Sequence, residues 1–305
     1  MKSNVEQLSF VGSAKPFIKW AGGKSQILNE IRAKYPAGLG KSIIKYAEPF
    51  VGGGAVLFDV LNNYSLSEVY VSDINRELIH VYACIRDRLY DLVYILEKME
   101  YEYLQANEQT RDHIYYETRK RFNVLKAIKS EETELAALFI FLNRTCFNGL
   151  YRVNGSGEFN VPAGSYKTPK ICDRYNLEEV SLSLKKVNIV CADYKKSCAF
   201  IDAQTFVYFD PPYRPLSRTS NFNSYSQDGF DDDSQIELAH FINEMNEKGA
   251  HIILSNSDPK NSDDTDDFFD KLYLRHNISR IEAMRMINSI ASGRGKISEL
   301  LITNY

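Results

Sequence analysis

The chain has 305 residues, of which 44% are hydrophobic and 25% charged, and its formal net charge is −3. This is the balance of an ordinary globular protein, and the length allows a sizeable core without disulfides or metal clips. The longest apolar run, about 136–142, is far shorter than a membrane span, and residues 1–9 are too polar for a signal peptide, so we expect no membrane association and a cytoplasmic location.

Hydrophobic periodicity predicts strands that alternate with helices. The expected strands are 43–47, 68–73, 187–191, 205–210, 251–255, 277–282 and 299–303, with helices after Gly23, over about 75–88 and between the later strands. This alternation predicts an α/β fold with a mainly parallel sheet covered on both faces. Helical periodicity over about 90–145, followed by a Gly-, Asn- and Pro-rich loop, interrupts the pattern. We therefore expect an inserted lobe, 90–186, between two parts of one domain, 1–89 and 187–305.

The first predicted strand ends in a glycine-rich turn, Glu48-Pro-Phe-Val-Gly-Gly-Gly54. Glycines at the carboxyl end of a strand let a ligand approach the backbone and open a helix N-terminus toward it. Leu57 stands where a nicotinamide-type fingerprint needs its third glycine, so that motif is excluded. Asp73 ends the next strand about 20 residues later, where a carboxylate can accept hydrogen bonds from both hydroxyls of a ribose. Its alternative role is a helix N-cap together with Asn75.

The most specific motif is Asp210-Pro211-Pro212-Tyr213, directly after a buried-strand pattern. This motif suits methylation of an exocyclic amino group such as N6 of adenine. The N6 lone pair is delocalised into the ring, so this nitrogen is a poor nucleophile. A carboxylate and a backbone carbonyl that accept its two N–H bonds favour a pyramidal nitrogen, and Asp210 and Pro211 can supply them. Pro212 holds Pro211 extended, and Tyr213 offers an aromatic face for a base drawn out of a duplex. A proline turn explains the prolines but not the flanking Asp and Tyr, so we predict amino methylation.

Near the N-terminus, Lys19-Trp20-Ala21-Gly22-Gly23-Lys24 combines an aromatic ring, a tight turn and two cations. The spacing of a phosphate-binding P-loop is absent. Trp20 is either an ordinary core residue or, with Lys24, a clamp for a cofactor that carries a carboxylate.

The distribution of charge allows a nucleic-acid surface despite the acidic total. Residues 228–270 carry two basic and thirteen acidic side chains, a local charge of −11, so the rest of the chain carries +8 because the total is −3. A basic recognition patch is compatible with this balance; a solvated acidic face is the alternative explanation. The five cysteines lack Cys-x-x-Cys spacing and the five histidines form no ligand cluster, so we expect no metal site.

Together these motifs resemble the DNA adenine methylase (Dam-type) family, S-adenosylmethionine-dependent enzymes that methylate N6 of adenine in GATC. The resemblance runs from about Lys15 to Tyr305. It rests on motifs at matching spacing: Phe17–Lys24, Glu48–Gly54, Phe147–Arg152, Phe159–Pro162, Asp210–Tyr213, Leu254–Asn256 and Gly295–Leu300.

The resemblance implies a Rossmann-like methyltransferase sheet, formed by 1–89 and 187–305, with a helical target-recognition lobe at 90–186. It implies that S-adenosylmethionine is held by Trp20, Lys24, Phe50, Gly52, Gly54, Asp73 and Asp210. Contacts to double-stranded DNA are implied for Lys19, Asn148, Leu150, Arg152, Pro162 and Tyr166, around a flipped-out adenine. A cognate restriction endonuclease that acts on the same site is a further expected partner. The acidic segment 258–270 is less typical of the family.

Two alternatives remain open. A related enzyme could methylate another DNA sequence, or an amide or guanine amino group on protein or RNA, although the latter enzymes usually have an Asn-Pro-Pro-Tyr start and another motif order. A DNA-binding protein built on a decayed methyltransferase is the second alternative, and the intact Asp210, Tyr213, Asp73 and Trp20 argue against it.

Overall fold

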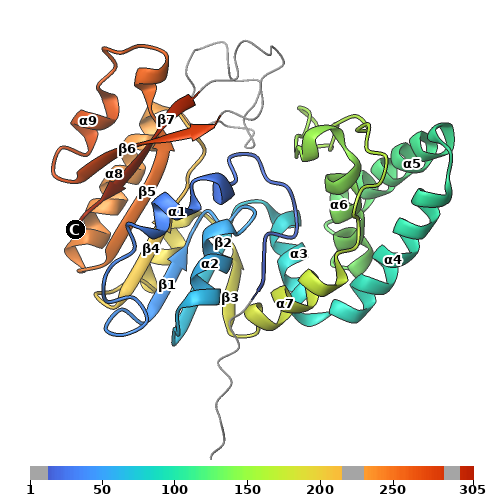
Figure 1. Ribbon diagram of the computed structural model, residues 1–305, viewed down its shortest axis with the longest axis horizontal. Helices are drawn as coiled ribbons and strands as arrows, with labels where there is room; N and C mark the ends of the chain where they lie inside the picture. Colours follow the sequence, from blue (N-terminus) through green and yellow to red (C-terminus); the bar gives the residue numbers. More distant parts are fainter. Residues whose placement is uncertain (1–12, 215–229, 285–295) are drawn as a thin grey trace, which may run out of the picture.

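The computed structural model describes residues 13–214, 230–284 and 296–305, and within them a seven-stranded sheet is central (Figure 1). Its strands are β1 (Lys45–Glu48), β2 (Glu68–Asp73), β3 (Val187–Cys191), β4 (Thr205–Phe209), β5 (His251–Ser257), β6 (Asn277–Met284) and β7 (Lys296–Thr303). They lie in the order β3-β2-β1-β4-β5-β7-β6; the first five are parallel, and β7 is antiparallel to both of its neighbours. The predicted mainly parallel α/β sheet is confirmed, and each strand overlaps a predicted one.

Strand β4 shows why the central strands are apolar throughout. All its residues are buried, and successive side chains point to opposite faces of the sheet. Phe206 and Tyr208 belong to the larger hydrophobic cluster. Val207 and Phe209 belong to a second cluster, which includes residues of the helices at 232–247 and 268–272. A parallel sheet buried on both faces requires such continuous apolar strands.

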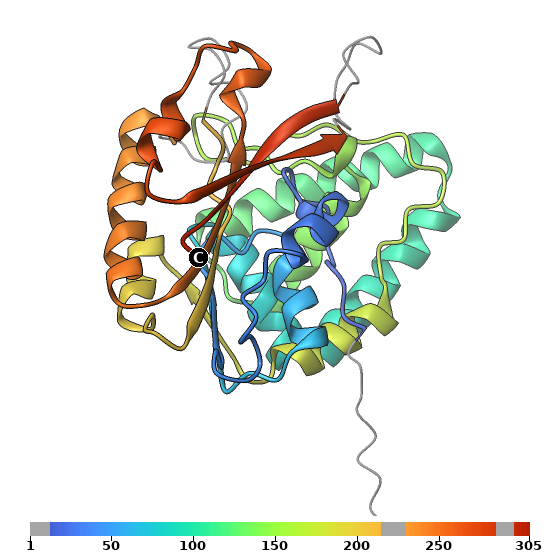
Figure 2. The same cartoon turned by 60° about the vertical axis from the view of Figure 1, so that its left-hand side comes forward.

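Helices connect the strands and form a lobe at one side of the sheet (Figures 1 and 2). Those around the sheet are α1 (Leu28–Arg32), α2 (Ala55–Asn63), α3 (Arg76–Asp87), α7 (Arg174–Leu184), α8 (Asp232–Glu247) and α9 (Phe268–Leu272). Those of the lobe are α4 (Leu89–Gln105), α5 (Glu108–Ala127) and α6 (Thr133–Thr145). Short 3₁₀ turns occupy Lys24–Gln26, Phe147–Gly149, Tyr194–Ala199 and Pro259–Asn261. The helix expected after Gly23 is therefore a 3₁₀ turn followed by the short α1.

Residues between α6 and α7 fold back as a hairpin, recorded by the bridges Cys146↔Ala163 and Val153↔Phe159. Helix α3 contacts both α6 and α7, and residues of the lobe share the larger hydrophobic cluster with α2 and α3. The lobe is thus packed directly onto the sheet's own helices, which fixes the hairpin relative to the strand ends.

The acidic segment 258–270 is exposed over residues 261–265 and includes the start of α9, and some of its carboxylates are paired within the fold. Asp258 is 2% exposed and its carboxylate lies 3.0 Å from Nε of Arg280 on β6. Asp270 pairs with Nη2 of Arg280 at 2.7 Å and with Nζ of Lys260 at 2.9 Å. A large part of its charge is therefore compensated within the fold.

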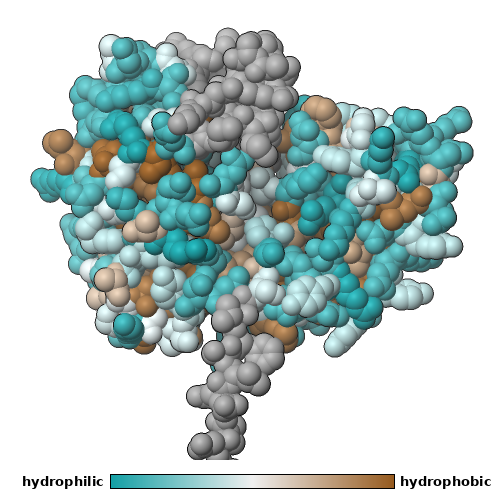
Figure 3. All heavy atoms as spheres, in the orientation of Figure 1, coloured by the Kyte–Doolittle hydropathy of each residue, from teal (hydrophilic) through white to brown (hydrophobic). Residues whose placement is uncertain are grey.

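The protein surface seen in Figure 3 is mainly hydrophilic, with hydrophobic side chains in small patches. Among the described residues, no helix combines the length and the apolar character that crossing a membrane requires.

Candidate active site and nucleic-acid interface

The predicted cofactor and catalytic residues lie at the carboxyl ends of the parallel strands. β1 pairs with β2 on one side and with β4 on the other, so the strand order reverses at β1. Ligands of open α/β sheets bind in the crevice outside such a reversal. The loop that follows β1, Glu48–Gly54, and the segment that follows β4, Asp210–Tyr213, therefore flank the position where this fold class holds its ligands.

Asp73, at the end of β2, is bonded to the glycine-rich loop. Its Oδ2 accepts a hydrogen bond from the Gly52 amide at 3.1 Å, and its Oδ1 accepts one from the Asn75 amide at 2.9 Å. Burial raises the pKa of Asp73, and the hydrogen bonds from the Asn75 and Gly52 amides oppose that shift. The N-cap of α3 is Asn75, whose side chain accepts from the Leu78 amide at 2.9 Å. Asp73 is therefore not the N-cap itself; it lies between the N-cap residue Asn75 and the glycine-rich loop and is bonded to both.

Trp20 lies against the glycine-rich loop. Its ring stacks on Tyr151 and Phe139, with centroid distances of 5.9 and 6.5 Å. A Cβ atom at Gly52, where φ is +46°, would come within 2.8 Å of Trp20 Cδ1. At Gly54, where φ is +74°, a Cβ would lie 2.5 Å from the Tyr82 hydroxyl. These glycines are required first by the close approach of protein side chains, a packing role that the sequence pattern did not predict.

Phe50, in the same loop, faces the other side of the sheet. Its ring stacks on Tyr194 with a centroid distance of 5.4 Å and meets Phe230 edge-on at 6.1 Å. Phe50 is only partly buried and borders the second hydrophobic cluster. The loop thus presents an aromatic ring on one flank and Trp20 on the other.

The catalytic candidate Asp210 is held by a buried ion pair. Nζ of Lys24, a residue that is 3% exposed, lies 2.7 Å from Asp210 Oδ1 and donates to the Gly22 carbonyl at 2.7 Å. The hydroxyl of Ser255 on β5 also donates to Asp210 Oδ1, at 3.0 Å. These two contacts fix the position of the Asp210 carboxylate. Lys24, predicted to touch the cofactor, thus also contacts the segment predicted to be catalytic.

Other residues of the Asp210–Tyr213 tetrad form hydrogen bonds with neighbouring elements. The Tyr213 hydroxyl donates to Glu299 Oε2 of β7 at 2.8 Å, and Nζ of Lys24 lies 4.8 Å from the Tyr213 ring centroid. Burial raises the pKa of Tyr213 far above its usual range, and the negative charges of Asp210 and Glu299 add to the shift. The Pro212 carbonyl accepts from Nε2 of Gln235 on α8 at 3.1 Å. Pro211 is buried.

The residues predicted to contact DNA gather around the hairpin. Asn148 is exposed at its start with φ +56°, a left-handed conformation that asparagine tolerates. The exposed Lys19 side chain reaches Tyr166, with Nζ 3.1 Å from the hydroxyl and 4.2 Å from the ring centroid. Pro162 is exposed, and its carbonyl accepts from the Phe147 amide at 2.9 Å. Lys19, Tyr166 and both ends of the hairpin therefore form one surface.

Arg152 and Leu150 differ in exposure. Arg152 is exposed, and its Nε donates to Asn160 Oδ1 across the hairpin at 2.8 Å. That bond orients the guanidinium edge. Leu150 is only partly exposed and packs against the larger hydrophobic cluster.

Four residues complete the site without having been predicted as members. Ser255 and Glu299 lie within the motifs Leu254–Asn256 and Gly295–Leu300, which carried the resemblance but no assigned role. Asn143 is 3% exposed and bonds the Lys19 amide and carbonyl, both at 2.8 Å, and the Gly149 carbonyl at 3.0 Å. Gln235 stands in an ordinary amphipathic helix, and nothing in its sequence context signals its contact with Pro212.

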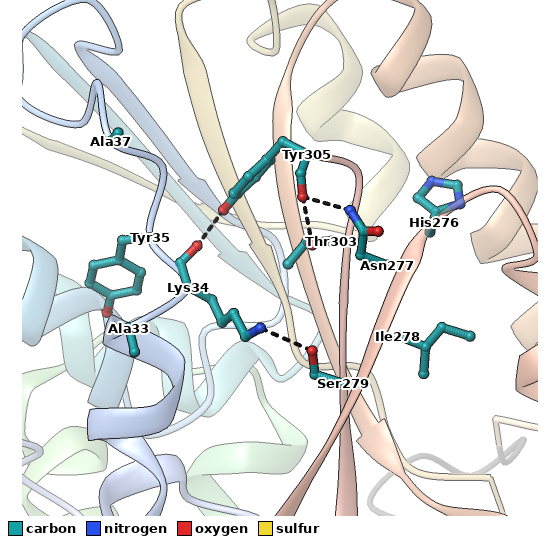
Figure 4. Close-up of a pocket in the computed structure, with 10 residues that line it drawn as sticks. All are labelled: Ala33, Lys34, Tyr35, Ala37, His276, Asn277, Ile278, Ser279, Thr303 and Tyr305. Carbon is teal, nitrogen blue, oxygen red and sulfur yellow. Dashed lines mark hydrogen bonds between the residues drawn. The ribbon is translucent and has the colours of Figure 1, made fainter.

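A separate cleft of about 670 Å³ lies between the segment after α1 and strands β6 and β7 (Figure 4). Within it, Nζ of Lys34 donates to Ser279 Oγ at 3.0 Å and the Tyr305 hydroxyl donates to the Lys34 carbonyl at 2.7 Å. Thr303 of its lining pairs with Ile253 near the start of β5, whereas Glu299 pairs with Ser257 at its end. The cleft and the Asp210–Tyr213 tetrad therefore lie at opposite ends of the strands.

Comparison with known proteins gives consistent matches over nearly the whole chain. Residues 20–287 match the model of the D12 class N6 adenine-specific DNA methyltransferases. The type II methyltransferase M.MjaIII of Methanocaldococcus jannaschii is 48% identical over 95% of this chain and 99% of its own length. The type II methyltransferase M1.LlaDCHI of Lactococcus lactis is 36% identical over 95% of both chains. The DNA adenine methylase of Escherichia coli K12 is 33% identical over 94% of both chains.

Proposed function

The chain belongs to the D12 class of N6 adenine-specific DNA methyltransferases, and on that premise we propose that it methylates a flipped-out adenine in GATC with S-adenosylmethionine as methyl donor. The observation that carries the proposal is the position of Asp210, held by Lys24 and Ser255 at the reversal of strand order, with Tyr213 beside it. Residues 1–89 and 187–305 would catalyse the reaction, and 90–186 would recognise DNA.

The residues present fit the donor. S-adenosylmethionine, when bound, supplies an electrophilic methyl group on a sulfonium. Asp73 offers carboxylate oxygens at the mouth of the loop for the ribose hydroxyls. Trp20 and Phe50 offer aromatic faces on either side of the glycine-rich turn, and Lys24 offers the cation that a carboxylate of the donor needs. No metal is required for this step.

Asp210 and Pro211 would bind the amino group of the target adenine. Both described contacts of the Asp210 carboxylate use Oδ1, so Oδ2 is the oxygen that we assign to one adenine N–H. The Pro211 carbonyl would accept the other N–H, which favours a pyramidal nitrogen. As the methyl–nitrogen bond forms, the methyl–sulfur bond of the sulfonium would break and leave a neutral thioether. Positive charge develops on N6 and its proton becomes acidic, so solvent can remove it without a dedicated base.

Recognition of DNA would use the hairpin surface. Asn148, Leu150 and Arg152 would read base edges, Lys19 would contact an outer base pair, and Pro162 and Tyr166 would support them. The exposed positions of Lys19 and Arg152 beside the site support this assignment. A planar guanidinium can bond a guanine edge bidentately, which suits a site containing G. A cognate restriction endonuclease stays a prediction, as does the cytoplasmic location.

The substitution Asp210→Ala tests the catalytic assignment. We expect single-turnover methylation of duplex DNA to fall by about 10²–10³, because a preorganised contact at the reacting atom is lost. DNA affinity should change much less. Ser255→Ala, which removes one support of Asp210 but leaves the carboxylate, is the matched control and should cost far less. Because Asp210→Ala leaves Lys24 buried without its partner, thermal unfolding of both variants is measured alongside turnover. Near-normal turnover by folded Asp210→Ala would refute the assignment.

A further inference from the structure

Arg214 follows the tetrad directly and is clamped by two carboxylates. Its Nε and Nη2 lie 2.5 and 2.9 Å from the oxygens of Asp232, and its Nη1 lies 2.5 Å from Asp266 Oδ2. The guanidinium also lies over the ring of Phe268, 4.3 Å from the centroid. The Arg214 side chain is only 19% exposed. This geometry fixes its orientation as well as its charge, because a bidentate pair constrains the guanidinium plane.

The partners of Arg214 are themselves anchored. Asp232 is in the first turn of α8, and Gln235, three residues on and hence on the same helix face, donates to the Pro212 carbonyl at 3.1 Å. Asp266 belongs to the acidic segment and accepts from the Phe268 amide at 3.0 Å. Helix α8 and the acidic segment therefore form hydrogen bonds and ion pairs with the residues before and after Tyr213.

We propose that Arg214 is a positioning residue for methyl transfer: through Asp232 and Asp266 it holds the Asp210–Tyr213 segment in its reactive orientation. This inference rests on the proposed function. It gives the acidic segment, whose composition alone predicts only solvated surface, a role in the active site. The reason is geometric, because displacement of a reacting group by about 1 Å can cost about 10² in rate. Arg214 acts through the tetrad and is not assigned a contact with substrate.

Arg280 supplies a matched control, since it forms the same kind of ion pair with the same acidic segment but has no described contact with the tetrad. We would compare wild-type enzyme with Arg214→Met, Arg214→Lys, Asp266→Asn and Arg280→Met. The measurements are single-turnover methylation of a GATC duplex, KM for DNA and donor, and thermal unfolding. Arg214→Met should lower the rate by about tenfold to a hundredfold with little change in either KM. Arg214→Lys should recover part of the rate, and Asp266→Asn should fall between.

Arg280→Met should lower the unfolding temperature while the methylation rate stays near that of the wild type. A wild-type methylation rate for folded Arg214→Met would overturn the inference. The inference would also be overturned if Arg214→Met and Arg280→Met lose methylation rate in the same proportion to their fall in unfolding temperature. A rise in KM for DNA alone would also overturn it and make Arg214 a DNA contact. If Arg214→Met does not fold, Asp266→Asn, which keeps the arginine, decides by the same criteria. A wild-type enzyme that does not methylate adenine would overturn the proposed function itself, which is a distinct result.

Discussion

At the scale of single residues, the site concentrates buried charge that needs partners. Lys24 and Asp210 are paired at 2.7 Å, and each has a further hydrogen bond, to Gly22 and from Ser255. A buried ion pair is tolerated only where such additional bonds satisfy it, and removal of one partner is strongly destabilising.

Glu48 lies in the same region, 2% exposed, and accepts from the Tyr46 hydroxyl at 2.7 Å. Burial raises the pKa of Glu48 well above its usual range, and the charge of Asp210 adds to this.

This pKa shift predicts a pH dependence of stability. The unfolded chain releases the Glu48 proton near pH 4.3, whereas the folded chain retains it to higher pH. The stabilisation linked to this proton is present below about pH 4.3 and is lost as pH rises through the folded pKa, by about 1.4 kcal/mol per pH unit. Glu48→Gln cannot titrate, so its free energy of unfolding should fall less between pH 5 and the folded pKa. Denaturant unfolding of both proteins across this range measures the difference; identical slopes would mean that Glu48 is ionised in the fold.

Arg152 gives a prediction about sequence reading. If its guanidinium bonds a guanine edge, Arg152→Ala should lower discrimination against sites with a substituted guanine by about 1–3 kcal/mol. Near-cognate sites should then lose much less activity than GATC. We would measure kcat/KM on GATC and on each single-base variant at two salt concentrations. A uniform loss, with a salt slope shallower by about one unit, would make Arg152 a phosphate contact and leave Leu150, Asn148 and Lys19 as the candidates for reading.

At the scale of elements, two asparagine side chains from the helices of the lobe hold the backbone of the hairpin. Asn143, near the end of α6, bonds backbone atoms of Lys19 and Gly149. Asn123 on α5 does the same at the other end of the hairpin, with its amide bonded to the Phe159 amide and carbonyl at 2.8 and 3.1 Å. Of these two asparagines, Asn143 is the one that bonds the segment before Trp20.

This difference predicts separate effects for two similar substitutions. Asn143→Ala and Asn123→Ala should each cost about 1–3 kcal/mol of stability, because each leaves backbone groups without partners. Asn143→Ala should also blur the preference for GATC over single-base variants, since Lys19 and Gly149 lose their common anchor. Unfolding and kcat/KM ratios on the same set of duplexes would separate these effects. Equal ratios for both variants would remove Asn143 from the recognition surface.

The strands were predictable because each combines a clear apolar pattern with a turn, and β4 with its Asp-Pro-Pro-Tyr ending shows this best. The short α1 was not, since it is preceded by the Lys24–Gln26 turn, whose Lys24 contacts Asp210, 186 residues later in the chain. The links of Arg214 to Asp232 and Asp266 span 18 and 52 residues, and no local pattern encodes pairs so far apart. Gln235 and Asn143 escaped prediction for the same reason.

At the scale of the whole molecule, acidic and basic charge lie in different parts of the chain, whereas the sheet and the lobe share one hydrophobic core. The acidic charge of 228–270 is bound up in part with Arg214, Lys260 and Arg280, and the rest of the chain carries a net positive charge. The larger hydrophobic cluster includes residues from both the sheet and the lobe. If the hairpin reads DNA as proposed, this shared core holds it at a fixed position relative to Asp210–Tyr213, which methylation of one base within a sequence requires.

The central claim is that this chain marks adenine within GATC. We would express it in a host that lacks adenine methylation and sequence the host DNA by a method that resolves modified bases, with Asp210→Ala as the control. We expect N6-methyladenine at nearly all GATC sites with the wild-type chain and at very few with Asp210→Ala. Methylation of adenine in another sequence would contradict the assigned recognition, and methylcytosine or unmodified DNA from a folded, expressed wild-type chain would contradict the claim as a whole.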